Sequence, residues 1–159
     1  SSMDFDSYIH GGDQEQKKRA GTENLAAIVG MVSALKENLE KQEEHFQHVQ
    51  NLETAFLAEL EDIQYYLNRG EHHLPYVLNI GFPGQKNDLL LLRLDLAGIS
   101  ISTGSACTAG IVQSSHVLEA MYGANSERLK ESVRISLSPQ NTVEDLQTLA
   151  KTLKEIIGG

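Results

Sequence analysis

The sequence has little of three features that mark common classes of protein. It contains one cysteine among 159 residues, which excludes an internal disulfide framework and suits a reducing compartment. It contains no apolar run that approaches the ~20 residues needed to span a bilayer. Its 13 Lys and Arg face 22 Asp and Glu, a formal net charge of -9, so its surface repels phosphate backbones. We therefore expect a cytoplasmic protein that binds neither nucleic acid nor membrane.

Several motifs of known chemistry are also missing from the sequence. No glycine-rich loop ends in Gly-Lys-Ser/Thr, which excludes the common phosphate-cradling loop. No serine stands in the arrangement of a nucleophile elbow. The histidines show no convincing ligand spacing with carboxylates or with the thiol, so we expect no metal site; they are His10, His45, His48, His72, His73 and His116.

A long helical pattern follows an irregular start of about 21 residues. Apolar residues recur at three- and four-residue steps from Leu25 to Leu39 and again from Phe46 to Ile63, and no Gly or Pro occurs between Gly30 and Gly70. We predict one long helix, or two helices with a bend near residues 41–45, extending for ~60 Å. Because that length exceeds the diameter of a small domain, part of the helix is expected to pack on something outside the core of this chain.

The remaining sequence alternates between short strand patterns and capped helices. Strands are predicted at 76–80, 99–102 and 133–137, and helices at 89–97 behind Asn87-Asp88, at 116–122 behind Ser114-Ser115, and from 143 behind a capping box that begins at Thr142. This order predicts an α/β (α+β) fold, in which helices cover one face of a small sheet and a long linking helix comes first. The sheet is too small for an independent doubly wound fold.

The single thiol, Cys107, stands in a stretch made otherwise of Ser, Thr, Gly and Ala, from Ser102 to Gly110. Such a stretch cannot anchor itself in a core, whereas structural cysteines are usually among the most buried residues. The pattern favours a reactive thiol over an inert one. No cationic residue lies near Cys107 in sequence, so activation would have to come from the fold or from a substrate.

Two further residues are candidates for binding. Arg134 is predicted on the strand face opposite Val133 and Ile135; it is either a solvated outer residue or a bidentate clamp for a carboxylate. Thr22 stands at or near the start of the long helix, where free N–H groups and the helix dipole attract phosphate. The simpler interpretation of Thr22 is an N-cap, and both roles could hold together.

Three segments together resemble the NifS-like cysteine desulfurases. They are the Gly-Gly…Arg-Ala-Gly-Thr-Glu-Asn run of residues 11–24, the Ser102-to-Cys107 loop and the Ser-Val-Arg-Ile-Ser strand of residues 132–136. The resemblance implies a fold type I, class V aminotransferase that uses pyridoxal 5′-phosphate to convert L-cysteine to L-alanine and a persulfide. It also implies that Cys107 is the nucleophile, Arg134 the substrate carboxylate clamp, and Thr22 a contact to the cofactor phosphate of the partner subunit in a homodimer. Two positions depart from the family pattern, because Asp13 replaces a usual glycine and Ile111-Val112-Gln113 replace the commoner Leu-Glu-Pro.

The same resemblance implies that the lysine that binds the cofactor is missing from this sequence. The family binds its cofactor through a lysine in a Ser-x-His-Lys segment, and no lysine here follows a histidine. We therefore expect a C-terminal fragment that is inactive alone, with residues 1–24 as the tail of the large cofactor domain and residues 25–159 as the small domain. Its persulfide would pass to an acceptor protein for iron–sulfur cluster assembly or tRNA thiolation. The alternatives are a cofactor-free sulfur-relay or regulatory module and a relative of the selenocysteine lyases.

Overall fold

The computed structural model describes residues 6–104 and 115–158. The chain divides into two compact units, residues 1–42 and residues 43–159, and each is described by itself. The predicted boundary between residues 24 and 25 stays a prediction.

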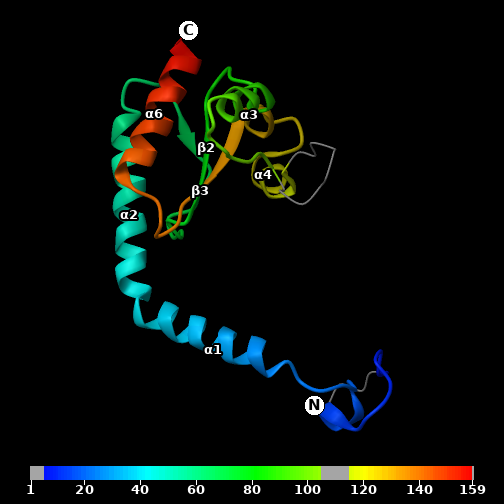
Figure 1. Cartoon of the computed structure of the whole chain (residues 1–159). Helices are drawn as coiled ribbons and strands as arrows, with labels where there is room; N and C mark the ends of the chain where they lie inside the picture. Colours follow the sequence, from blue (N-terminus) through cyan, green and yellow to red (C-terminus); the bar gives the residue numbers. More distant parts are fainter. Residues whose placement is uncertain (1–5, 105–114, 159) are drawn as a thin grey trace. The chain divides into compact units, whose positions relative to one another are not determined.

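The first unit contains a short 3-10 turn and one long helix. The turn, η1, spans Gln14–Lys17, and the helix, α1, spans Leu25–Glu40 (Figure 1). Asn24 caps α1, because its Oδ1 accepts a hydrogen bond from the backbone N–H of Ala27 at 3.1 Å. Lys41 is the C-cap of α1, and α2 begins at Gln42. Of the two alternatives that the sequence left open, one long helix or two helices with a bend near residues 41–45, the structure has two helices.

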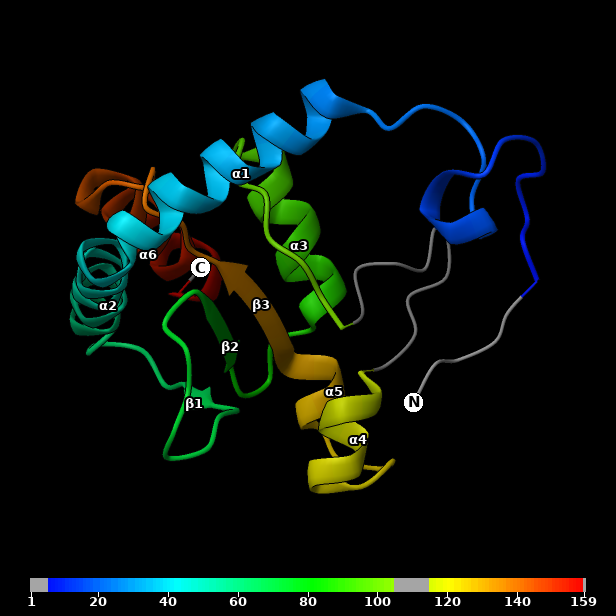
Figure 2. The same ribbon diagram turned by 90° about the horizontal axis from the view of Figure 1, so that it is seen from below.

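The second unit is built around a three-stranded sheet. Its elements, in chain order, are α2 (Gln42–Glu59), β1 (Tyr66–Leu67), β2 (Val77–Gly81), α3 (Asn87–Leu96), α4 (His116–Tyr122), α5 (Arg128–Glu131), β3 (Ser132–Ser136) and α6 (Val143–Gly158). The strands lie in the order β1-β2-β3 and all neighbours are antiparallel (Figure 2). In this register Asn79 of β2 stands opposite Arg134 of β3.

One face of the sheet carries the core. Leu78 and Ile80 of β2 and Val133 and Ile135 of β3 alternate with outward residues, and all four are buried. They form one cluster with buried side chains of three helices: Leu52 and Phe56 of α2, Leu90 and Leu94 of α3, and Leu149 and Leu153 of α6. The opposite face stays open enough to expose Val77 and to leave Arg134 half-buried. The expected small sheet with helices on one face is confirmed, and this asymmetry leaves Arg134 accessible.

In the second unit, the predicted helix caps are found at two of three places. Ser115 Oγ accepts from the backbone N–H of Leu118 at 3.3 Å, and the N–H groups of Thr142 and Asp145 bond to each other's side chains at 2.9 and 3.2 Å. The N-cap of α3, by contrast, is Lys86, which makes no side-chain capping bond. The strand predicted at 99–102 is reduced to one isolated bridge between Ser102 and Arg134. Over the described ranges, no helix combines the length and the apolar character that crossing a membrane requires.

Candidate functional site

Arg134 is fixed in place by Ser102. The two residues form an antiparallel bridge, in which Arg134 N donates to Ser102 O at 2.6 Å and Ser102 N donates to Arg134 O at 3.0 Å. Arg134 Nε also donates to Ser102 Oγ at 3.1 Å. The terminal guanidinium nitrogens of Arg134 have no hydrogen-bond partner among the described residues. A guanidinium held at Nε with its two-pronged end free suits the bidentate capture of a carboxylate.

A hollow of about 480 Å³ opens beside Arg134. Its floor is the open face of β2, from Val77 and Asn79, and one wall is α4, from His116, Val117 and Met121. The other wall is the turn between β1 and β2, which contributes Asn68, Arg69, Gly70, His73 and Leu74. Two arginines and two histidines thus share a hollow with a set of apolar side chains, in a chain of net charge -9. This lining, called here the Arg134 hollow, suits a small anion with an apolar part.

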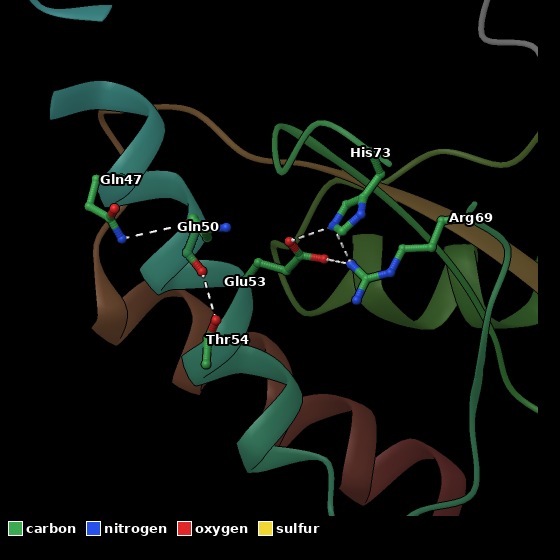
Figure 3. A network of polar contacts seen from close by, with 6 residues as sticks. All are labelled: Gln47, Gln50, Glu53, Thr54, Arg69 and His73. Atoms are coloured by element: carbon green, nitrogen blue, oxygen red, sulfur yellow. Dashed lines mark hydrogen bonds and ion pairs between the residues drawn. The ribbon is translucent and has the colours of Figure 1, made fainter. Parts of the chain in front are cut away.

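A buried carboxylate holds the turn wall of the Arg134 hollow. Glu53 of α2 is 5% exposed and forms an ion pair with Arg69 Nη1 (Figure 3). Its second oxygen lies 3.5 Å from His73 Nε2, and Arg69 Nη1 lies 2.8 Å from the same His73 nitrogen (Figure 3). Because arginine can only donate, His73 Nε2 accepts here, and the ring proton belongs on Nδ1. The sequence analysis did not predict this network. Arg69 and His73 follow Glu53 by 16 and 20 positions, and no local sequence pattern connects residues at such separations.

Asn68 ties the same turn to the sheet. It is buried, and its Nδ2 donates to Asn79 Oδ1 and to Ser132 Oγ, each at 2.8 Å. Its Oδ1 accepts from Arg128 Nη1 at 2.8 Å. Both polar ends of this buried amide are therefore satisfied, which is the condition under which a buried polar group does not destabilise a fold.

A second hollow, of about 590 Å³, lies between α4, α5 and β3. Its lining is more polar and includes Asn125, Ser126, Lys130 and Ser132. Gly104, Ser115 and Leu118 line both hollows. The two hollows are therefore neighbours that share the residues on either side of positions 105–114.

Cys107 lies outside the described residues. In the sequence it stands three positions after Gly104, a residue that lines both hollows.

Thr22 belongs to the first compact unit and is exposed. Its carbonyl oxygen accepts a hydrogen bond from Arg19 Nη1 at 3.4 Å. The interpretation of Thr22 as the N-cap is wrong: α1 begins at Leu25, and the capping oxygen comes from Asn24. A role for Thr22 toward a phosphate stays a prediction.

The described lining of the Arg134 hollow contains no lysine. Lys130 borders the second hollow and is exposed. The described side chains that surround Arg134 therefore do not provide the amine that a pyridoxal-phosphate Schiff base needs.

Comparison with known proteins places these features in context. The sequence profile described as "Aminotransferase class-V" matches residues 2–149. The chain is 45% identical over 152 residues to IscS 1 of Bacillus subtilis (strain 168), covering 94% of this chain and 40% of that protein. It is 38% identical over 152 residues to "Cysteine desulfurase IscS" of Dictyoglomus turgidum, covering 94% of this chain and 38% of the relative.

Among solved structures, the chain likewise matches part of the length of NifS-like proteins. A "NIFS-LIKE PROTEIN" matches with a TM-score of 0.78 and 31% identity, covering 96% of this chain and 38% of the other. The NifS-like protein from Rickettsia africae ESF-5 matches with a TM-score of 0.79 and 30% identity, covering 99% of this chain and 41% of the other. The chain thus spans about two fifths of the length of the proteins that it matches.

Proposed function

The chain belongs to the class-V aminotransferase family, and from this premise we propose that it forms the Cys107- and Arg134-bearing part of a cysteine desulfurase. The observation that carries the proposal is the state of Arg134. Arg134 is half-buried, its Nε is fixed by Ser102, and its terminal nitrogens have no hydrogen-bond partner among the described residues. It lines a hollow that Gly104 also lines, and the only cysteine of the sequence follows Gly104 by three positions. A carboxylate clamp and a lone thiol in one chain suit a reaction between that thiol and an amino acid.

The proposed substrate is L-cysteine. Arg134 binds its carboxylate, and the apolar α4 wall of the Arg134 hollow packs against its carbon chain. The thiolate of Cys107 attacks the substrate sulfur, so that an S–S bond forms while the substrate C–S bond breaks and its electron pair stays on the carbon. Protonation of that carbon gives L-alanine, and the persulfide remains on Cys107.

Pyridoxal 5′-phosphate would act as the electron sink for that carbon. Because the described residues around Arg134 include no lysine, the Schiff base would come from a lysine that is not among them. Thr22 would contribute a contact to the phosphate, across the boundary of a homodimer. This assignment agrees with residues 1–24 being the tail of a cofactor domain and residues 25–159 the small domain.

The persulfide would then pass to an acceptor protein. The two acceptor classes that fit the proposed chemistry are scaffolds of iron–sulfur cluster assembly and enzymes of tRNA thiolation, in the cytoplasm. Neither requires this acidic chain to bind nucleic acid itself.

The test measures persulfide formation and alanine release in the longest polypeptide that carries this chain. With L-cysteine and cofactor, the wild type should release alanine and carry one persulfide per chain. Cys107→Ala should abolish the persulfide and leave the visible absorbance of the bound cofactor unchanged. Persistent labelling of Cys107→Ala by a persulfide-specific reagent would refute the role of the thiol. Parallel rates with L-selenocysteine separate a desulfurase from a selenocysteine lyase.

A second candidate function is a cofactor-free sulfur relay. It is favoured by the same absence of lysine from the described lining of the Arg134 hollow. The 159-residue chain would then accept sulfur from a persulfide donor without releasing alanine. Transfer of labelled sulfur to Cys107 of the isolated chain, with no alanine produced, would support this candidate over the first.

A further inference from the structure

A stack of aromatic and cationic groups connects the sheet to α4. The ring of Tyr66, on β1, lies over Gly81 of β2 so closely that a Cβ at Gly81 would collide with it. The guanidinium carbon of Arg128 lies 4.1 Å from the centroid of the Tyr66 ring and 4.4 Å from the centroid of the Tyr122 ring. Tyr122 is the last residue of α4. The order of the stack is therefore Gly81, Tyr66, Arg128 and Tyr122, from the middle of the sheet to the end of the helix.

Tyr66 and Arg128 are each fixed by hydrogen bonds of their own, in addition to the stacking contact between them. The hydroxyl of Tyr66 donates to Glu131 Oε2 at 3.1 Å, and Glu131 Oε1 accepts from Gly84 N at 2.8 Å. Arg128 Nη1 donates to the buried Asn68 at 2.8 Å. The guanidinium is therefore fixed both in its plane, by the amide, and on its faces, by the rings. It is a rigid support for α4 rather than a mobile surface arginine.

The helix that contacts Arg128, α4, is too short to be stable in isolation. α4 has seven residues, whereas isolated helices shorter than ~12 residues are marginal in water. Leu118 is its only buried residue. Its contacts with the rest of the unit, including the Arg128–Tyr122 contact, must therefore determine where it lies.

The position of α4 shapes the Arg134 hollow. His116, Val117, Leu118 and Met121 form the wall of that hollow, and Leu118 also borders the second hollow. A shift of α4 would therefore change the space in front of Arg134 without touching Arg134 itself.

We propose that Arg128 is a positioning residue, which fixes α4 against the sheet by stacking between Tyr66 and Tyr122 and so sets the wall of the Arg134 hollow. It touches no substrate. Its effect on substrate rests on the proposed function, whereas its effect on α4 does not.

The experiment compares Arg128→Lys with the wild type in the longest polypeptide that contains these residues. Lysine keeps the charge but has no planar group to lie between two rings while donating to Asn68. Amide hydrogen exchange over 116–122 should become about tenfold faster, while exchange over 143–158 stays unchanged. The kcat/KM for L-cysteine should fall about tenfold, because the hollow wall loses its fixed place.

Two controls separate positioning from general loss of structure. Arg93→Lys changes another arginine that joins two elements, since Arg93 Nη1 donates to the carbonyl of Ile156 at 3.3 Å, and it should leave both readouts as in the wild type. Tyr122→Phe keeps a ring under the guanidinium and should also match the wild type, whereas Tyr122→Leu should repeat the effect of Arg128→Lys.

The possible results distinguish failure of this proposal from failure of the proposed function. Unchanged α4 exchange in Arg128→Lys overturns the proposal, and so does faster exchange with an unchanged kcat/KM. If the wild type forms no persulfide, the proposed function fails; α4-specific acceleration would then still support the anchoring of α4 by Arg128.

Discussion

Ser102 and Arg134 are joined by four hydrogen bonds. Two connect their backbones, Arg134 Nε donates to Ser102 Oγ at 3.1 Å, and Ser102 Oγ donates to the carbonyl oxygen of Arg134 at 3.4 Å. The backbone bonds fix where the residues lie, and the bond from Nε fixes which way the guanidinium faces. Only the two side-chain bonds depend on the serine hydroxyl.

Ser102→Ala should therefore impair substrate binding without unfolding the protein. We expect KM for L-cysteine to rise by about three- to tenfold, since one hydrogen bond to a charged group is lost. The thermal midpoint should stay near that of the wild type because both backbone bonds remain. Ser100→Ala is the matched control: Ser100 is exposed, two positions away, and should change neither value.

Arg134→Lys tests the carboxylate clamp directly. Lysine keeps the positive charge but cannot bind a carboxylate with two parallel hydrogen bonds. In steady-state assays, kcat/KM for L-cysteine should fall by about 100-fold or more. Denaturant unfolding should differ little, since Arg134 lies half-buried on the open face of the sheet. A wild-type kcat/KM in this variant would leave the hollow without its proposed anion site.

Gly81→Ala should destabilise the second unit, because the added Cβ would run into the ring of Tyr66. Overpacking of this kind costs about 1–3 kcal/mol, measurable by urea unfolding. Gly30→Ala is an informative counterpart, because a Cβ at Gly30 would meet nothing within 4 Å. Gly30 lies inside α1, so alanine there should favour the helix by about 1 kcal/mol. Equal effects of the two changes would contradict the predicted clash.

The capping box of α6 predicts a pH dependence. The backbone N–H of Thr142, followed by its side chain, holds the pKa of Asp145 below its usual value of 3.8. Because the folded pKa is lowered, the charged carboxylate stabilises the fold above the unfolded pKa, and this stabilisation is lost as the pH falls through the folded pKa.

Carbon NMR of the Asp145 carboxyl should therefore show a midpoint below 3.8. Asp145→Asn should remove this residue's share of the acid-induced loss of stability, which is seen by comparing unfolding midpoints at pH 7 and in the acid range. A variant that keeps the wild-type slope would show that the cap contributes nothing to it.

The elements with a strong period were predictable from the sequence. The repeats of α1, α2 and α6 and the alternation of β3 each depend on many residues, so each identifies an element. For α2, α6 and β3 the pattern also identifies the buried face, whereas α1 has no buried residue. β1 and α5 were missed because two residues and four residues hold no period. The strand expected at 99–102 fails because only Ser102 reaches a partner.

The candidate site was predictable only in part. Alternation placed Arg134 opposite Val133 and Ile135, and three segments together supplied the resemblance, residues 11–24, 102–107 and 132–136. The walls of the hollow were not predictable, because Glu53, Arg69 and His73 meet only through the tertiary fold. Similarly, no local pattern connects Tyr66 to Arg128.

The short connection between Gly104 and Cys107 has a kinetic consequence. Under the proposed function, the nucleophile belongs to the same chain as the carboxylate clamp and follows by three positions a residue that lines both hollows. Its attack on a molecule bound beside Arg134 is then intramolecular, so conversion should be first order in the complex. Small thiols in solution should not compete with it. Inserting residues between Gly104 and Cys107 would dilute the nucleophile, although every side chain of the site would remain.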